Sequence, residues 1–161
     1  MIEKFSVLNE QEFQKLLSAV SEITILIAGA DGKIDKEETT WAKKVAAIRT
    51  YKMHSDLLPF YQELGKSFAN DLDRLITELP KDTNERQSLL VKSLSDLNPI
   101  LAKLDEKTGT RLYQSFKTFA KHVANASGGF LGFFTIDAKE IKLIDLPMIN
   151  PITAQLNDEE E

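Results

Sequence analysis

Two acidic turns in this chain combine residue types that could hold a metal ion. The first reads Ala28-Gly-Ala-Asp-Gly-Lys-Ile-Asp-Lys-Glu-Glu38 and carries carboxylates at Asp31, Asp35 and Glu38. Hard divalent cations such as calcium and magnesium take several oxygen ligands, many of them from carboxylates. The turn therefore indicates cation binding more than catalysis.

A fainter copy of this turn returns later in the chain. It reads Ala124-Asn-Ala-Ser-Gly128 and, after a six-residue insertion, Thr135-Ile-Asp-Ala-Lys-Glu140. We expect the two turns to meet, because the small residues that precede them let two helix ends approach closely. Carboxylates crowded together repel one another unless a cation neutralises them. The predicted metal ligands are Asp31, Asp35, Glu38, Asp137 and Glu140.

The first turn overlays only the second half of an EF-hand loop. Asp31 takes loop position five and Glu38 position twelve, but Ile27 and Gly29 fall at positions one and three, where side-chain oxygens are required. A complete EF-hand is therefore not expected. A purely structural interpretation also stays open, because an aspartate N-cap such as Asp35 stabilises a helix by about 1 kcal/mol.

Apolar spacing predicts helices on both sides of the first turn. Asn9 and Glu12 form a capping-box pattern at the start of one helix, which should end near Gly32. Its buried face is expected to comprise Phe13, Leu16, Leu17, Val20, Ile23 and Ile27. Asp35 and Glu38 then open a second helix, which should turn Trp41, Ala42, Val45 and Ile48 inward.

The rest of the chain also has helical periodicity. A third helix is predicted from about Asp56 to Leu79, a fourth from 83 to 104 with a break at Pro99, and a fifth from 107 to 126. Asp137 should cap a short sixth helix that Pro147 ends. The Gly128–Phe134 stretch is either a loop tucked onto the core or an exposed apolar patch for a partner or a membrane surface.

These patterns predict an all-α fold: a single-domain bundle of six or more helices over residues 1–152, followed by a disordered acidic tail at 153–161. The net charge of −5 is concentrated in that tail, since Asp158–Glu161 hold four of the 25 acidic residues against 20 basic ones. A near-neutral body gives no basic face for nucleic acid.

Composition narrows the function further. The chain has no cysteine, which excludes disulfides and thiolate sites, and fits a reducing compartment. No apolar run approaches the ~20 residues of a membrane span, and the first residues lack a signal pattern. We therefore expect a cytoplasmic protein without a transmembrane segment; peripheral membrane contact stays open.

Enzyme chemistry is not expected. His54 and His122 are the only histidines, and no Ser–His–Asp spacing, phosphate-cradling glycine loop or His-Glu-x-x-His helix is present. His122 lies about one helical turn before Ala126 and could approach the second acidic turn. A lone histidine on a helix is more typical of a surface or packing residue than of a metal ligand.

The paired motifs resemble those of the tellurite-resistance TerB family and its TerB-like relatives. The matching stretches are Ile27–Glu38 and Val123–Glu140, within a resemblance that spans roughly Phe13 to Ile149. It implies an all-helical bundle of two pseudo-symmetric helix–turn–helix halves. It also implies an acidic patch that binds divalent metal, and a bacterial stress-response role exercised through protein partners. Asp31, Glu38 and Glu140 fall on the family's acidic positions.

The leading hypothesis is thus a non-enzymatic, TerB-like module that binds a divalent metal through its paired acidic turns. The alternative is a protein-interaction scaffold that uses the Phe130–Phe134 loop and has no functional metal site.

Overall fold

The fold is all-helical in the part of the chain that the computed structural model describes, residues 3–126 and 142–156. Within those ranges there are seven α-helices, a short 3-10 helix at Glu3–Phe5, and no strand. The Phe130–Phe134 loop and the start of the predicted sixth helix at Asp137 lie outside the described residues. The described part of that predicted helix, residues 142–144, is helical, and the helix ends before Pro147 as expected. In the described part, no helix combines the length and the apolar character that a membrane span requires.

Helix α1, Glu10–Ala28, begins as its sequence predicts. The Asn9 side chain accepts from the backbone of Glu12, and the Glu12 carboxylate accepts from the backbone of Asn9. The helix ends slightly earlier than expected, with Gly29 as its C-cap. All six residues of the predicted buried face are buried, and so are Ser21, Thr24, Ile25 and Leu26. The second half of α1 is therefore enclosed by other helices.

Helix α2, Lys36–Ile48, is oriented differently from the prediction. Ala42 and Val45 are buried as expected, but Trp41 and Ile48 are each 38% exposed, so their inward assignment was wrong. The buried stripe instead follows Glu38, Ala42, Val45 and Arg49, at the i, i+4, i+7, i+11 spacing of one helix face. Two polar residues define this stripe, and a search for apolar residues alone passes over them.

The single helix predicted over residues 56–79 is two helices, α3 at Leu58–Gly65 and α4 at Phe68–Glu78. The chain turns at Lys66 and Ser67 between them. Gly65 has no side chain at a point where a Cβ would lie 2.5 Å from the Thr50 methyl group, so the end of α3 packs closely on the end of α2. The predicted break at Pro99 is confirmed: α5 spans Thr83–Ser95 and α6 spans Asn98–Leu101.

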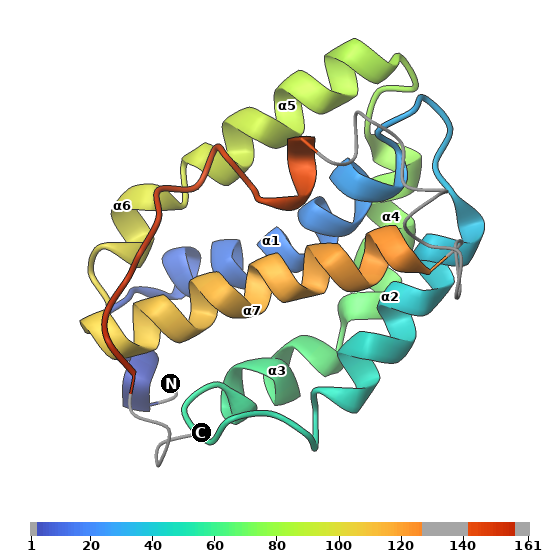
Figure 1. Ribbon diagram of the computed structural model, residues 1–161. Coiled ribbons are helices and arrows are strands. Elements are labelled where there is room, and N and C mark those ends of the chain that lie inside the picture. The colour runs from blue at the N-terminus through green and yellow to red at the C-terminus, as the bar shows by residue number, and fades with distance from the viewer. Residues whose placement is uncertain (1–2, 127–141, 157–161) are drawn as a thin grey trace.

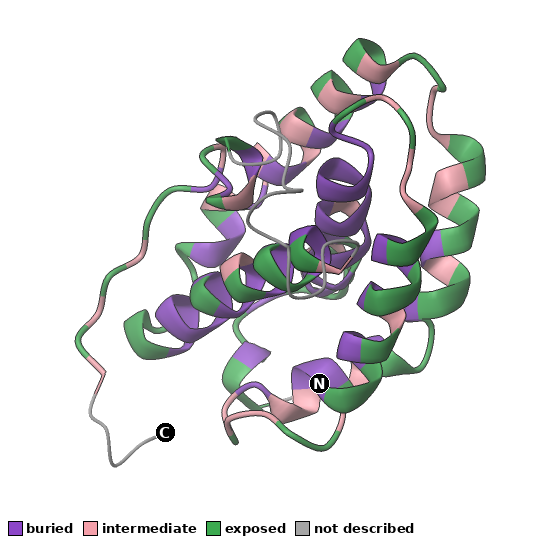
Figure 2. Cartoon of the chain, turned by 45° about the vertical axis from the view of Figure 1, so that its right-hand side comes forward, coloured by how far each residue is buried: buried purple, intermediate pink, exposed green. Residues whose placement is uncertain are grey.

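Helix α7, Glu106–Asn125, matches the prediction closely and runs beside α1 (Figure 1). Helix α1 also contacts α2, α4 and α5, and α2 packs along α7. Buried residues concentrate on α1 and on the inner face of α7, whereas α2, α4 and α5 expose their outer faces (Figure 2). These contacts make the fold a helical bundle built around α1.

The C-terminal segment 142–156 is a short helical turn followed by chain without regular secondary structure. It runs back past α6 toward the start of α7 (Figure 1). Asn98 fastens it by accepting from the Asn150 backbone at 2.7 Å and donating to the Met148 carbonyl at 3.1 Å. The predicted tail begins at residue 153; its described part reaches residue 156, and the Ala154 backbone donates to Thr110 Oγ1 at 2.9 Å.

Candidate functional site

The first acidic turn is a compact bend between α1 and α2. The Gly32 backbone donates to the Gly29 carbonyl at 3.0 Å, and the Asp35 backbone donates to the Ala28 carbonyl at 3.0 Å. Gly32 has φ of 112°, a conformation that residues with side chains rarely adopt, as its sequence position predicts. The bend thus places Asp35 directly over the end of α1.

A buried arginine that the sequence analysis did not identify holds this turn. The Arg86 guanidinium, on α5, donates to the carbonyls of Gly29 at 3.0 Å and Gly32 at 3.3 Å. A side chain on Gly29 would meet the Arg86 Nη2 atom at 2.8 Å, so the glycine leaves room for the guanidinium. A cation at the C-terminal end of α1 is favourable, because carbonyl groups concentrate negative charge there.

The carboxylates of the first turn differ in environment. Asp35 caps α2 by accepting from the Glu38 backbone at 3.0 Å, as predicted, and Asp31 is exposed. Glu38 is buried, with 1% of its surface exposed. Residues 3–126 and 142–156 contain no group of three or more histidine, cysteine, aspartate or glutamate side chains placed to hold a metal ion. The first turn alone is therefore not a complete ligand set.

The second turn begins beside α2. Ala126 follows the last residue of α7 and lines the same surface hollow as Lys36, Glu37, Thr40 and Trp41 of α2. The chain therefore enters its second motif next to the first turns of the helix that Asp35 caps. The predicted ligands Asp137 and Glu140 lie outside the described residues, and so does Ser127; the expected meeting of the two turns stays a prediction.

The opposite end of α2 carries a second buried cation, Arg49. Its guanidinium donates to Tyr61 Oη, to the Ser115 carbonyl and to Thr118 Oγ1, each at 2.9 Å. It also lies 5.1 Å from the centre of the Tyr61 ring and 5.3 Å from that of Phe119, within cation–π range. These partners come from α3 and α7, so Arg49 ties three helices together.

The two histidines lie in different surroundings. Burial, together with the positive charge of Arg49, lowers the pKa of His122, which favours its neutral form. His54 Nδ1 accepts from the Asp56 backbone at 3.0 Å, far along the chain from both motifs.

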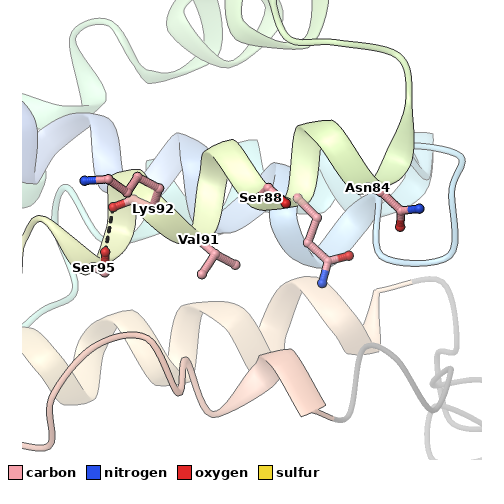
Figure 3. A pocket seen from close by; sticks show the side chains of 6 residues that line it. Asn84, Ser88, Val91, Lys92 and Ser95 are labelled. Atoms are coloured by element: carbon pink, nitrogen blue, oxygen red, sulfur yellow. Dashed lines mark hydrogen bonds between the residues drawn. The ribbon is translucent and has the colours of Figure 1, made fainter.

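Another surface hollow has no carboxylate or imidazole among its lining residues. It runs along α5 with a volume of about 650 Å³ (Figure 3). Its lining has amide and hydroxyl groups, one apolar side chain and one amine, without a carboxylate or an imidazole: Asn84, Gln87, Ser88, Val91, Lys92 and Ser95. Such a surface supplies hydrogen bonds and, at Lys92, one positive charge.

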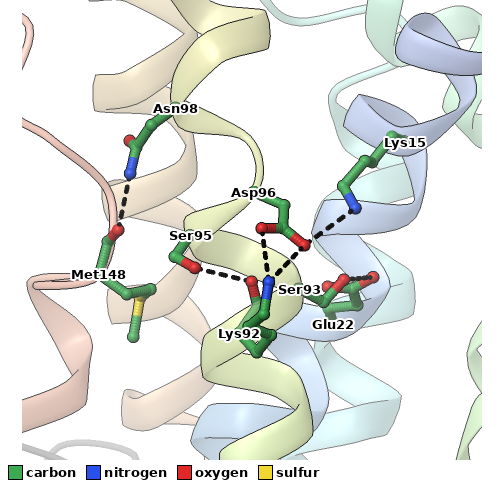
Figure 4. Close-up of polar contacts among 8 residues, drawn as sticks. All are labelled: Lys15, Glu22, Lys92, Ser93, Ser95, Asp96, Asn98 and Met148. Carbon is green, nitrogen blue, oxygen red and sulfur yellow. Dashed lines mark hydrogen bonds and ion pairs between the residues drawn. The ribbon is translucent and has the colours of Figure 1, made fainter.

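Polar contacts near this hollow have a structural role (Figure 4). Ser93 donates to Glu22 at 2.9 Å, and Asp96 pairs with Lys92 at 3.1 Å and with Lys15 at 3.8 Å. Burial raises the pKa of Glu22, and the Ser93 hydrogen bond acts against that rise. These contacts connect α5 to α1 and thereby help to hold Arg86 over the acidic turn.

Comparisons of this chain with protein-family models, with curated protein sequences and with solved structures found no match.

Proposed function

We propose that the chain is a non-enzymatic, TerB-like module that binds a divalent cation between its two acidic turns. The proposed ligands are Asp31, Asp35 and Glu38 from the first turn, with Asp137 and Glu140 from the second. The proposal places the protein in the bacterial cytoplasm, acting through protein partners in a response to tellurite-type stress.

One observation carries this proposal: the end of α7 lies against the first turns of α2. Ala126 and Thr40 line one hollow, so the second motif starts beside the helix that the first motif opens. Asp35 stands at the N-terminus of α2, where backbone N–H groups stabilise negative charge. A second acidic turn arriving at that end would add carboxylates to those already there.

Arg86 limits which groups of the first turn could serve as ligands of the cation. Backbone carbonyls can also serve as ligands of a hard cation. Here the carbonyls of Gly29 and Gly32 already accept hydrogen bonds from a buried guanidinium. The proposed cation is therefore held by carboxylates contributed by two turns, and neither turn alone should bind it.

Calorimetric titration with calcium, magnesium, manganese and zinc tests the proposal. We expect a single site per chain that binds at least one of these ions more tightly than millimolar. Because Asp31 is exposed, Asp31→Asn removes a carboxylate without disturbing the core. It should weaken binding, as should Glu140→Gln in the second turn, and the pair together should abolish it.

A matched control separates a specific site from general charge. Asp73→Asn with Glu78→Gln removes the same charge from exposed positions on α4. This variant should bind as the wild type does. Equal weakening in both double variants, or no binding tighter than millimolar to any of the four ions, contradicts the proposal.

A second candidate function, an interaction scaffold, is favoured by the outer face of α2. Trp41 and Ile48, seven residues apart on one face of α2, are each 38% exposed, and Tyr51, in the turn that follows α2, is 72% exposed. Lys44 lies over the Trp41 ring at 6.0 Å, and Lys52 is exposed beside Tyr51. Aromatic residues flanked by lysines suit a partner whose apolar surface is edged by carboxylates.

The scaffold function is tested by comparing partner binding in two triple variants. Alanine at Trp41, Ile48 and Tyr51 should prevent a partner from co-purifying and should abolish its binding to the isolated protein. Alanine at Val7 and Leu89, which are exposed elsewhere, with Lys66→Ala should leave both intact. Retention of the partner by the α2 variant contradicts this function, whatever the outcome of the metal titration.

A further inference from the structure

The exposed stripe along the outer face of α2 has opposite charges at its two ends. It contains, at the i, i+4, i+7, i+11 spacing of one helix face, Glu37, Trp41, Lys44 and Ile48. The Lys52 backbone donates to the Ile48 carbonyl at 2.9 Å, so one helical hydrogen bond extends beyond α2 and Lys52 lies at the end of the stripe. The stripe therefore has a carboxylate at one end, an amine at the other, and two apolar side chains between them.

This order of residues makes the stripe complementary to a second copy of itself. In a symmetric dimer, residue i of one copy contacts residue j of the other, and residue j contacts residue i in return. If two antiparallel copies of α2 cross just after Lys44, residues at equal distances on either side of that point face each other. Trp41 then faces Ile48 of the second copy, and Glu37 faces Lys52 of the second copy. Each match occurs twice, once on either side of the two-fold axis.

The charged groups at the two ends of the stripe are available for such a contact. Within residues 3–126 and 142–156, neither the Glu37 carboxylate nor the Lys52 amine has an ion pair or a hydrogen bond, and both side chains are exposed. Opposite charges across an interface fix its register more than they add affinity. The affinity would come from Trp41 and Ile48, because aromatic residues are enriched in the cores of interfaces.

A surface hollow and an exposed aromatic side chain also occupy matching positions. The hollow that Ala126 shares with the first turns of α2 has a volume of about 520 Å³. Tyr51, about one helical turn beyond Ile48, is 72% exposed. In the antiparallel arrangement, Tyr51 of the second copy lies level with the first turns of α2. Its ring therefore reaches the part of the surface where the hollow lies.

We propose that the outer face of α2 is the contact surface of a symmetric dimer, in which a second copy of the chain packs its own α2 antiparallel to the first. This inference rests on the interaction-scaffold function and names its partner. A contact centred on one helix is small, and small interfaces are typical of transient complexes. The two Lys44 side chains also repel each other near the axis, so the dimer should dissociate readily.

Sedimentation equilibrium of the full chain, from micromolar to millimolar concentration, tests the inference. EDTA is present throughout, so that a shared cation cannot link two copies. We expect a monomer–dimer equilibrium without larger species, because a symmetric contact uses the face of each copy once. Lys44→Gln should tighten the dimer, since it removes the repulsion at the axis. Lys66→Gln, at an exposed lysine that follows α3, should leave the equilibrium unchanged.

Two charge reversals test the predicted pairing of residues. Glu37→Lys creates two like-charged pairs in the dimer, and so does Lys52→Glu. Each variant alone should raise the dissociation constant of the dimer by at least about tenfold, because like charges that face each other across an interface are costly. An equimolar mixture of the two variants should form a heterodimer, since both of its pairs again join opposite charges.

A matched control reverses the same charges at exposed positions elsewhere, with Glu78→Lys on α4 and Lys66→Glu after α3. Each control variant should dimerise as the wild type does, both alone and in the mixture. This control separates the specific pairing from the effect of overall charge.

Three outcomes overturn the inference. A chain that stays monomeric at millimolar concentration does not bind a second copy through α2; the scaffold function would then require a different partner, which its co-purification test detects independently. Dimerisation that the charge reversals leave unchanged, or that mixing does not restore, places the contact elsewhere. A dimer that forms only when a divalent cation replaces EDTA is linked by the metal rather than by the stripe.

Discussion

The two ends of helix α2 carry opposite charges, and only the acidic end could be predicted from the sequence. Its N-terminus carries Asp35 as cap and the buried Glu38, and its C-cap is the buried Arg49. Both arrangements follow the direction of the helix dipole. The residues of the acidic end lie in one short stretch of sequence, whereas those of the basic end come from α2, α3 and α7.

This difference separates a local motif from a tertiary one. Asp35 satisfies a neighbour three residues away, so its role can be predicted from spacing alone. Arg49 satisfies Tyr61, Ser115 and Thr118, which are up to 69 residues away in sequence. We expect the basic end of α2 to hold the bundle together and the acidic end to bind the proposed divalent cation.

The largest predicted effect is at the basic end. Arg49→Met removes a buried guanidinium together with its three hydrogen bonds, and the acceptors on α3 and α7 lose their donor. We therefore expect a loss of roughly 3 kcal/mol in the free energy of unfolding. Arg49→Lys should recover only part of it, because an ammonium cannot reproduce the planar fork. Urea unfolding measures both; a loss below about 1 kcal/mol for Arg49→Met would remove Arg49 from this role.

Arg86 should matter less, because its hydrogen bonds go to two carbonyls of one turn, whereas those of Arg49 go to groups on two helices, α3 and α7. Arg86→Gln is expected to lower the free energy of unfolding by about 2 kcal/mol and to loosen the first acidic turn. Hydrogen exchange at Gly32 and Asp35 should then accelerate. Arg74→Gln, at an exposed arginine on α4, serves as control and should change little. Unchanged exchange in the turn would show that Arg86 does not hold it.

Asp35 and Asp82 offer a matched pair that distinguishes a helix cap from a metal ligand. Each caps its helix through a comparable hydrogen bond, 3.0 Å for Asp35 and 2.9 Å for Asp82. Without metal, alanine at either position should cost about 1 kcal/mol. With saturating cation, only Asp35→Ala should lose additional stability in thermal unfolding. Equal losses at both positions under both conditions would leave Asp35 a cap only.

The smallest predicted effect is a change in the pKa of His122, at the basic end of α2. Burial and the charge of Arg49 lower the pKa of His122 in the folded protein. The neutral imidazole therefore stabilises the fold at pH values above the pKa of the unfolded chain, near 6.5. This stabilisation is lost as the pH falls through the lower pKa of the folded protein. Arg49→Met should raise the pKa of His122 toward the ordinary value while leaving it lowered by burial. NMR titration measures this, and Lys121→Met is the neighbouring-charge control. A pKa that does not move would contradict the electrostatic contribution of Arg49.

Sequence patterns located most helix boundaries because caps and prolines act locally. Asn9, Asp35 and Pro99 each stand where the structure has the start of a helix or a break. The division between α3 and α4 was missed, although Gly65 followed by Ser67 is a signal for it. Apolar periodicity continued through that turn and concealed it.

The candidate site was predictable only in part. The carboxylates were visible in the motifs, but Arg86 and Arg49 were not, because a buried arginine has the same sequence signature as a surface one. Trp41 and Ile48 were assigned inward for the related reason that polar Glu38 and Arg49 define the buried stripe of α2. Burial of charge depends on partners that only the tertiary fold assembles.

The most direct test of the cation site is a crystal structure of the full chain grown with manganese, whose anomalous scattering locates the ion. The account predicts one peak near the N-terminus of α2, with oxygens of Asp31 or Glu38 and of Asp137 or Glu140 as ligands at the short distances typical of metal–oxygen bonds, within about 2.6 Å. A peak contacting only one turn, or no peak near either turn, would contradict it.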